Sequence, residues 1–176
     1  MFTNYFTHPY KSSKHVHPFQ TQIDFLSRRA LTIEGAGDAR ITLTTAQDLA
    51  NVTALAVEYQ DEWPVIGGIK GEDFSVDQII ALGEKIRGGA PFDVEALHAE
   101  DLKKGVVKAS WMPRMDHPSV PPEQVDQLAA AFLSGAMMGI GAEALRVSGE
   151  WNRLLPDYKF TGAEEFLCEE WARHSQ

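Results

Sequence analysis

The chain has 176 residues, of which 44% are hydrophobic, and it carries a formal net charge of −9. This length is sufficient for one domain with a single hydrophobic core. The negative charge disfavours the attraction to phosphate groups that supports most nucleic-acid binding, and no stretch approaches the ~20 apolar residues of a membrane span. We therefore expect a globular protein with no nucleic-acid partner and no membrane partner.

The charge is distributed unevenly along the chain. Residues 1–29 contain four Lys or Arg and one Asp, so the remaining residues carry a net charge of −12. A solvated basic arm explains this segment more simply than an anion site does. Cys168 is the only cysteine, which precludes an intrachain disulfide and favours a reducing compartment. The first residues lack the continuous apolar core of a secretory signal, so we expect a cytoplasmic protein.

The pattern along the chain predicts an α/β fold of short strands and amphipathic helices. Residues 1–20 form an aromatic and histidine-rich segment in which two prolines interrupt any long helix. Residues 21–29 have the composition of a short helix. A short strand is expected over residues 31–33, and a glycine-containing turn over residues 34–38.

Residues 40–88 contain two consecutive strand-then-helix units, and they carry the clearest structural pattern. In the first unit, apolar residues near Ile41 precede Thr45, which can cap a helix that has Asp48 in its first turn. This helix is amphipathic and needs a sheet to cover it. Its expected apolar face consists of Leu49, Val52 and Ala56.

The second unit begins with the apolar run of residues 63–66, which two glycines follow. Such a run is typical of a buried strand that ends in a loop. Ser75 and Gln78 then have the spacing of a capping box, and Gly88 is placed to end the helix. Both units therefore predict strands that belong to a larger, incomplete parallel sheet.

The remaining residues predict one more strand and three helices. Residues 92–97 alternate between apolar and mostly acidic residues, as in a half-buried strand, and a short helix over residues 100–104 follows. Residues 106–121 are a Pro-rich linker, and we interpret residues 122–176 as a helical cap. The longest helix begins at Pro122, and its expected apolar positions are Val125, Leu128, Ala129, Phe132, Ala136 and Ile140.

The last predicted helix of this cap has a capping box at Thr161 and Glu164, with an apolar face that includes Leu167 and Trp171. Taken together, these elements make the whole chain, residues 1–176, a single domain. The sequence shows no internal repeat.

No residue pattern identifies a reaction. The glycines at positions 35 and 37 precede a strand and not a helix, so they do not form a dinucleotide-binding fingerprint. His8, His15 and His17 have no carboxylate or thiol at metal-ligand spacing, and surface histidines explain them better. We therefore predict no metal site and no catalytic residue.

Methionine and aromatic residues between positions 111 and 138 are a weaker signal. Trp111 and Phe132 belong to this group, which suits a pocket for a small apolar ligand as well as it suits a hydrophobic core. A core is the simpler interpretation, and both remain open.

Several motifs in order resemble one protein family. They are FTNYF near the start, EGAGDARITLTTAQDLANVTALAVEY, WPVIGG with the following SVDQIIALGEKIRG, and LLPDYKFTGAEEFLCEEW at the end. Together they resemble the C-terminal, substrate-binding part of NmrA-like, isoflavone-reductase-like atypical short-chain dehydrogenases, especially the fungal members. The resemblance covers residues 2–171, and its motifs are structural more than catalytic.

The resemblance implies a Rossmann-type fold whose complete form binds NADP or NAD. In that family a Gly-rich phosphate loop and a catalytic lysine precede the matching segment, and neither motif occurs in this sequence. The resemblance further implies that aromatic residues near the start contact the substrate, a small apolar or aromatic molecule. The implied contacts are Phe2, Asn4, Tyr5 and Phe6, with Trp111 and Phe132 as weaker candidates. No catalytic residue can be transferred, and the cofactor-binding residues stay unknown.

Three functional hypotheses follow from this resemblance. The chain is the substrate-binding part of an NAD(P)-dependent reductase, or a non-enzymatic NmrA-like regulator or interaction module, or an inert fragment from a truncated gene model. Because parallel strands are ordinarily paired on both edges, the isolated chain should expose apolar surface. We therefore expect a partner chain or self-association to cover it.

Overall fold

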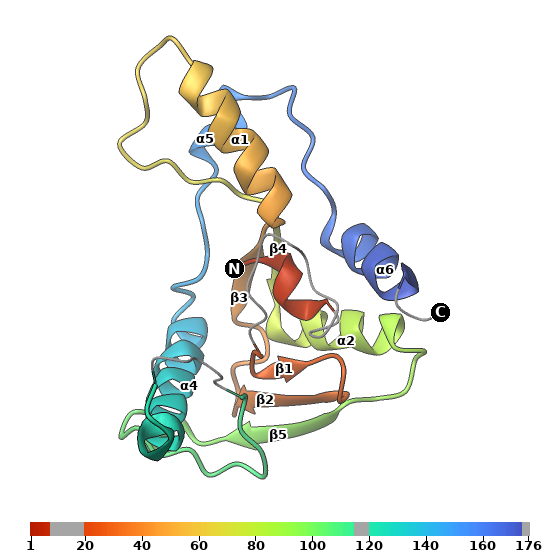
Figure 1. Cartoon of the computed structure of the whole chain (residues 1–176), viewed down its shortest axis with the longest axis vertical. Coiled ribbons are helices and arrows are strands. Elements are labelled where there is room, and N and C mark those ends of the chain that lie inside the picture. The colour runs from red at the N-terminus through yellow and green to blue at the C-terminus, as the bar shows by residue number, and fades with distance from the viewer. Residues whose placement is uncertain (8–19, 115–119, 174–176) are drawn as a thin grey trace.

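A computed structural model describes residues 1–7, 20–114 and 120–173, and it confirms the α/β class. The described part contains two small sheets with helices around them (Figure 1). The elements in chain order are η1 (Thr3–Phe6), β1 (Ile23–Asp24), β2 (Arg29–Ile33), β3 (Arg40–Leu43), α1 (Ala46–Glu58), β4 (Glu72–Ser75), α2 (Val76–Ile86), β5 (Asp93–Leu97), α3 (Ala99–Leu102), η2 (Pro122–Gln124), α4 (Val125–Gly141), α5 (Glu150–Leu154) and α6 (Ala163–Arg173).

The two sheets have different pairing. In the three-stranded sheet, β2 is central, with β1 antiparallel on one side and β5 parallel on the other. In the second sheet, β3 pairs with β4 in antiparallel register, with Ile41 opposite Phe74. Parallel pairing between strands of the described chain is thus limited to β2 and β5, and the parallel sheet is incomplete, as expected.

The main hydrophobic core lies between the sheets and helix α2. Ile41, Ile79 and Leu167 are almost completely buried there, and they come from β3, α2 and α6. A second cluster joins Leu31 and Leu97 to helix α4, and a third joins α1 to α5. Figure 1 shows α1 and α5 side by side at one end of the molecule, far from β5.

Helices α1 and α2 begin where the sequence predicts. The Thr45 hydroxyl accepts a hydrogen bond from the backbone N–H of Asp48, and Val52 and Ala56 are buried. At α2, Ser75 and Gln78 form the complete capping box, with distances of 3.1 Å and 2.8 Å. The helix ends before Gly88, whose positive φ suits a residue without a Cβ atom. The local terminus signals of both helices are therefore confirmed.

The predicted buried strand over residues 63–66 is wrong. These residues form an exposed loop between α1 and β4, in which Val65 is 102% and Ile66 68% exposed. The strand that follows α1 is instead β4, at residues 72–75, and it occupies the place beside β3. The short helix expected over residues 21–29 is also wrong, because Ile23 and Asp24 pair with β2 and a turn follows.

Two further predictions need correction in the last third of the chain. Helix α4 forms, but Leu128 and Phe132 are 41% and 50% exposed, and the buried face runs through Leu133 and Met137. Because α4 is apolar on nearly every side, the pattern alone did not indicate which side packs. The predicted Thr161 capping box is absent, since the first N–H of α6, at Ala163, donates to Glu72 of β4 over 2.6 Å.

Helices in residues 122–176 cover three separate surfaces. Helix α4 packs beside β2 and β3, α5 packs with α1, and α6 contacts α2 and η1. No helix in the described part of the chain is both long and apolar enough to cross a bilayer.

Candidate functional site

An open groove of about 440 Å³ lies between the start of the chain, the start of α1 and the end of the loop before β4. Its volume falls within the range of about 300–1,000 Å³ that is common for small-molecule sites. Apart from the Met1 ammonium group, which donates to the carbonyl of Thr42 over 2.7 Å, the described lining residues are uncharged. They are Met1, Phe2, Tyr5, Thr44, Leu49, Gly67, Gly68, Ile69 and Val147.

Backbone pairing with the end of β3 positions the aromatic wall of the groove. The N–H of Thr44 donates to the carbonyl of Met1 and the N–H of Thr3 donates to the carbonyl of Thr44, both over 3.0 Å, so the first residues run parallel to β3. The chain then turns into η1, which places the rings of Phe2 and Tyr5 5.9 Å apart. Both residues are half-buried, so each ring presents a surface to the groove.

The opposite wall depends on two glycines that pack tightly against the segment before α5. The N–H of Gly68 donates to the Glu150 carboxylate over 3.1 Å, and its carbonyl accepts from the N–H of Trp151. A Cβ atom on Gly68 would lie 2.1 Å from the carbonyl oxygen of Ser148, and one on Gly67 would lie 2.9 Å from Trp151. Only glycine fits at Gly68, and this close approach fixes the width of the groove.

A polar network lies behind the groove, where β3 meets β4. The Thr42 hydroxyl and the Lys70 ammonium donate to the carboxylate of Asp73 over 2.7 Å and 2.8 Å. Burial alone would raise the pKa of Asp73, but these two donors, with Arg146, hold its pKa below the usual value. Arg146 also pairs with Glu143 over 2.9 Å, so the two cations of this network face two carboxylates. The described lining of the groove is mostly apolar, and the Thr44 hydroxyl within it donates to the carbonyl of Ile69 and accepts from the N–H of Gly71.

Two of the six predicted contact residues, Phe2 and Tyr5, line this groove. Asn4 is buried and has a structural role, because its Oδ1 atom accepts a hydrogen bond from the N–H of Ala46 over 2.8 Å at the start of α1. Phe6 is 1% exposed and packs against Phe25, with 5.2 Å between the ring centroids. Asn4 and Phe6 therefore support the groove from behind, and the prediction that they contact a substrate stays untested.

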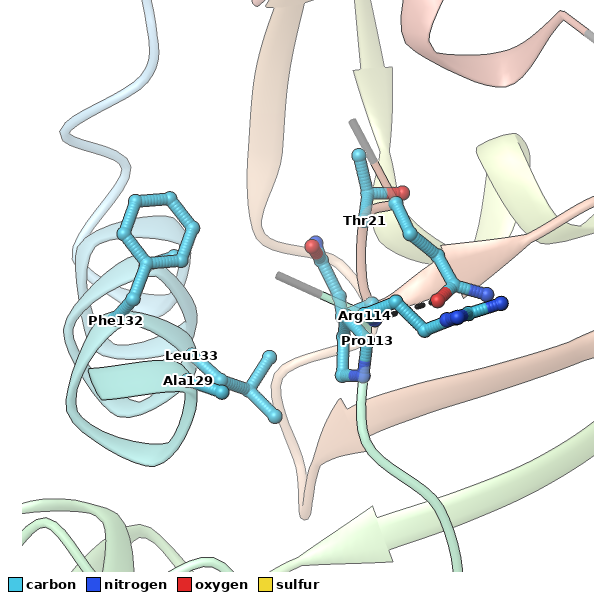
Figure 2. A pocket seen from close by; sticks show the side chains of 9 residues that line it. Thr21, Pro113, Arg114, Ala129, Phe132 and Leu133 are labelled. Carbon is cyan, nitrogen blue, oxygen red and sulfur yellow. Dashed lines mark hydrogen bonds between the residues drawn. The ribbon is translucent and has the colours of Figure 1, made fainter. Parts of the chain in front are cut away.

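Trp111 and Phe132 lie away from the groove, near helix α4. The Arg29 guanidinium lies 4.1 Å from the centre of the Trp111 ring, and Trp111 packs against the cluster beneath α4. Figure 2 shows Phe132 on α4, across from the segment that carries Pro113 and Arg114. The cavity beside Phe132 has a volume of about 20 Å³, which is enough for about one water molecule. This second location therefore has no room for an aromatic ligand in the present structure.

Sequence reasoning missed the remaining lining residues of the groove. Thr44 and Leu49 lie in the predicted first strand-and-helix unit, but their position suggested only packing. The glycines at positions 67 and 68 were interpreted as the end of a strand, and Val147 gave no signal. These residues meet only because the loop before β4 folds back onto the segment before α5.

The described residues form no group of three or more His, Cys, Asp or Glu that could hold a metal ion. Cys168 is exposed on α6. Within the described lining of the groove, no side chain is a carboxylate, an imidazole or a thiol. This arrangement can bind and orient a ligand, and the described lining supplies no evident general base.

Comparison with known proteins gives little further identification. No family model matches the chain, and no curated protein matches it. A solved structure described as a nucleoside-diphosphate-sugar epimerase from Staphylococcus aureus is similar, with 18% sequence identity and a TM-score of 0.47. The similarity covers 78% of this chain and 43% of that one, so this chain spans less than half the length of that protein. A similarity of this extent carries no conclusion about function.

Proposed function

We propose that this chain is the substrate-binding part of an NAD(P)-dependent reductase of the NmrA-like, isoflavone-reductase-like family. The observation that carries the proposal is the position of Phe2 and Tyr5. The sequence resemblance selects both residues as substrate contacts, and both line a groove of ligand size. Their selection used no structural information, so their meeting in one groove is independent support.

The lining indicates a neutral, apolar or aromatic ligand. The rings of Phe2 and Tyr5 can pack against an aromatic face, and Leu49 and Ile69 supply aliphatic contacts. The Thr44 hydroxyl, which already donates to the carbonyl of Ile69 and accepts from the N–H of Gly71, can accept one more hydrogen bond that orients a polar substituent. A carboxylate or phosphate on the ligand would find no cationic side chain in the described lining to compensate its desolvation, and the Met1 ammonium group already donates to the carbonyl of Thr42.

The cofactor of the complete family protein, NADP or NAD, would supply the hydride. This sequence has no Gly-rich phosphate loop, so we expect no hydride transfer by this chain alone. The part played by this chain is then to hold the substrate in a fixed orientation.

Binding of a neutral aromatic probe tests the proposed site. We expect 2-naphthol, titrated into the isotopically labelled chain, to shift the NMR signals of Leu49, Ile69 and Val147. Tyr5→Ala should weaken binding by about tenfold, because an aromatic contact is lost. Phe132→Ala is the matched control, since it removes an aromatic ring outside the groove.

Shifts centred on Phe132, or no saturable shifts at all, would contradict the site. A non-enzymatic regulator or ligand-binding module would share the groove and differ in hydride transfer. Oxidation of NADPH by the protein purified from its own cells separates the two functions. Binding in the groove without NADPH oxidation, across a panel of aromatic ketones, would favour the regulator.

A further inference from the structure

The loop that joins α1 to β4 exposes an apolar segment, residues 63–66. Trp63 is 53% exposed, Val65 102% and Ile66 68%, so three large apolar side chains lie together in water. Single exposed apolar residues are ordinary on a protein surface, but a contiguous group marks an interaction site. This segment forms the most concentrated such group in the described chain.

The backbone of this segment is also unsatisfied by the described residues. From residue 63 to residue 66, no backbone N–H or carbonyl group makes a hydrogen bond within the described part of the chain. The same residues have the composition of a buried strand, with two β-branched residues and a tryptophan. A segment with strand composition, apolar side chains and unpaired backbone groups can add to the edge of a sheet.

Trp63 anchors the start of this segment to the rest of the chain, and Val65 and Ile66 face solvent. The ring of Trp63 packs edge-on against buried Trp151, with 5.1 Å between centroids. A cavity of about 340 Å³ lies beside the segment, and Trp63, Val65 and Leu154 contribute to its lining. Pro64 lacks a backbone donor, which restricts the segment to pairing along one side, as in an edge strand.

Charge around the segment favours a partner that differs from this chain. Glu58, Asp61 and Glu62 precede it, and none of them makes an ion pair with another described residue. Residues 58–69 contain no Lys or Arg, and the chain as a whole carries a net charge of −9. A second copy that docked through the same segment would bring the same carboxylates to the contact, whereas a partner with a basic surface would neutralise them.

We propose that residues 63–66 are a docking segment for the open edge of a β-sheet in a partner polypeptide with basic residues around that edge. The segment adds to the partner's sheet through its backbone, and Val65 and Ile66 pack on opposite faces of that sheet because successive side chains of a strand alternate. Lys or Arg side chains of the partner pair with Asp61 and Glu62. This proposal goes beyond the proposed function and does not depend on a ligand in the groove.

A synthetic strand peptide serves as the probe. The nonapeptide KVTVKVTVK, with blocked ends, should bind the chain and slow amide exchange at Trp63 and Val65, whose N–H groups lie on the side opposite Pro64. Val65→Asp should weaken binding by about tenfold, because a charged group replaces a valine that the complex would bury. The peptide EVTVEVTVE, in which glutamate replaces lysine, should bind much more weakly.

Val94→Asp is the matched control variant, because Val94 is a 46% exposed valine on the edge strand β5. It should leave peptide binding unchanged. Protection at Val94 in place of Val65, or equal binding of both peptides, overturns the proposal.

Two other occupants of the segment are separate outcomes. A dimer in sedimentation experiments that Val65→Asp converts to a monomer would replace the partner by a second copy. Co-sedimentation of the chain with phosphatidylcholine vesicles, lost in Val65→Asp, would replace it by a lipid surface. Either result overturns the proposal, and neither changes the test of the groove.

Discussion

Helices α1 and α2 begin in the same way but are held in the molecule by different forces. Each follows a hydroxyl residue that accepts a hydrogen bond from the backbone three residues later. Helix α2 then buries Val76, Ile79, Ile80, Leu82 and Gly83 against the main core. Helix α1 buries only Asp48, Val52 and Ala56, and one of these three is a carboxylate.

The buried carboxylate explains how α1 is attached. The hydroxyl groups of Tyr158 and Thr45 donate to Asp48 over 2.7 Å and 2.6 Å, and the N–H of Thr161 donates over 3.1 Å. Burial, followed by the hydrogen bond to Asp48, raises the pKa of Tyr158, which therefore remains a donor. These bonds connect α1 to a segment more than 100 residues later. An amphipathic pattern thus predicts that a helix packs, but not whether apolar area or a polar network attaches it.

Loss of the Asp48 carboxylate should have the largest effect. Asp48→Ala leaves the buried hydroxyl of Thr45 and the half-buried donors of Tyr158 and Thr161 without an acceptor, and we expect a loss of about 3 kcal/mol in the free energy of unfolding. Chemical denaturation followed by circular dichroism measures this change. Tyr158 should also show faster exchange with solvent in NMR spectra, because its partner is gone.

Glu58→Ala is the control for this experiment. Glu58 is exposed at the C-terminal end of the same helix, where a negative charge is unfavourable, so its removal should change stability by less than about 0.5 kcal/mol. Equal effects of the two substitutions would show that Asp48 acts only through helix propensity.

Apolar packing of α2 should show the next largest effect. A Cβ atom at Gly83 would lie 2.7 Å from a ring atom of Phe25 and 2.8 Å from one of Phe92. Both rings are buried and have little room to move, so Gly83→Ala should cost about 2 kcal/mol despite the better helix propensity of alanine.

Gly135→Ala in α4 is the opposite case. A Cβ atom there meets nothing within 4 Å, so alanine should stabilise the chain by about 0.5–1 kcal/mol. Thermal unfolding of both variants measures the contrast. A stabilised Gly83→Ala protein would show that α2 packs less tightly than the structure indicates.

Removal of the α2 cap should have the smallest effect of the three. Ser75→Ala removes the acceptor for the N–H of Gln78, and we expect a loss of about 1 kcal/mol. Ser75→Asp keeps an acceptor at the same position and should retain most of the stability. Ser75→Ala and Asp48→Ala could instead lower the free energy of unfolding equally. The local cap of α2 would then be as important as the long-range network of α1, and the proposed difference between the two helices would be wrong.

The starts of α1 and α2 and the α/β class could be predicted because their causes are local. A hydroxyl residue satisfies an N–H three residues away, whatever else the chain does, so Thr45 and Ser75 had readable signals. The resemblance selected Phe2 and Tyr5, which line the groove, but no pattern indicated which elements face them, and their contact with a ligand stays a prediction. Asn4 and Phe6 lie in the same short segment as Phe2 and Tyr5, and yet their side chains are buried behind the groove.

Predictions failed where the deciding contact came from a distant part of the chain. The apolar run of residues 63–66 has strand composition, but β4 takes the place beside β3, which leaves this run in solvent. Thr161 has the spacing of a capping residue, but its hydroxyl and N–H bind Asp48, 113 residues earlier. In α4 the apolar residues surround the helix, so the sheet it meets decides which side is buried.

The sequence by itself determined the α/β class, the caps of α1 and α2, and the aromatic character of the first residues. These features depend on backbone hydrogen bonds and side-chain properties within a few residues. Only the tertiary structure decided that Phe2 and Tyr5 meet Gly67 and Gly68 across a groove, and that residues 63–66 lie exposed. Both outcomes depend on which segments pair with β3 and with the residue that follows it. The first residues pair with Thr44 and β4 pairs with β3, and no local pattern indicates such pairing between distant segments.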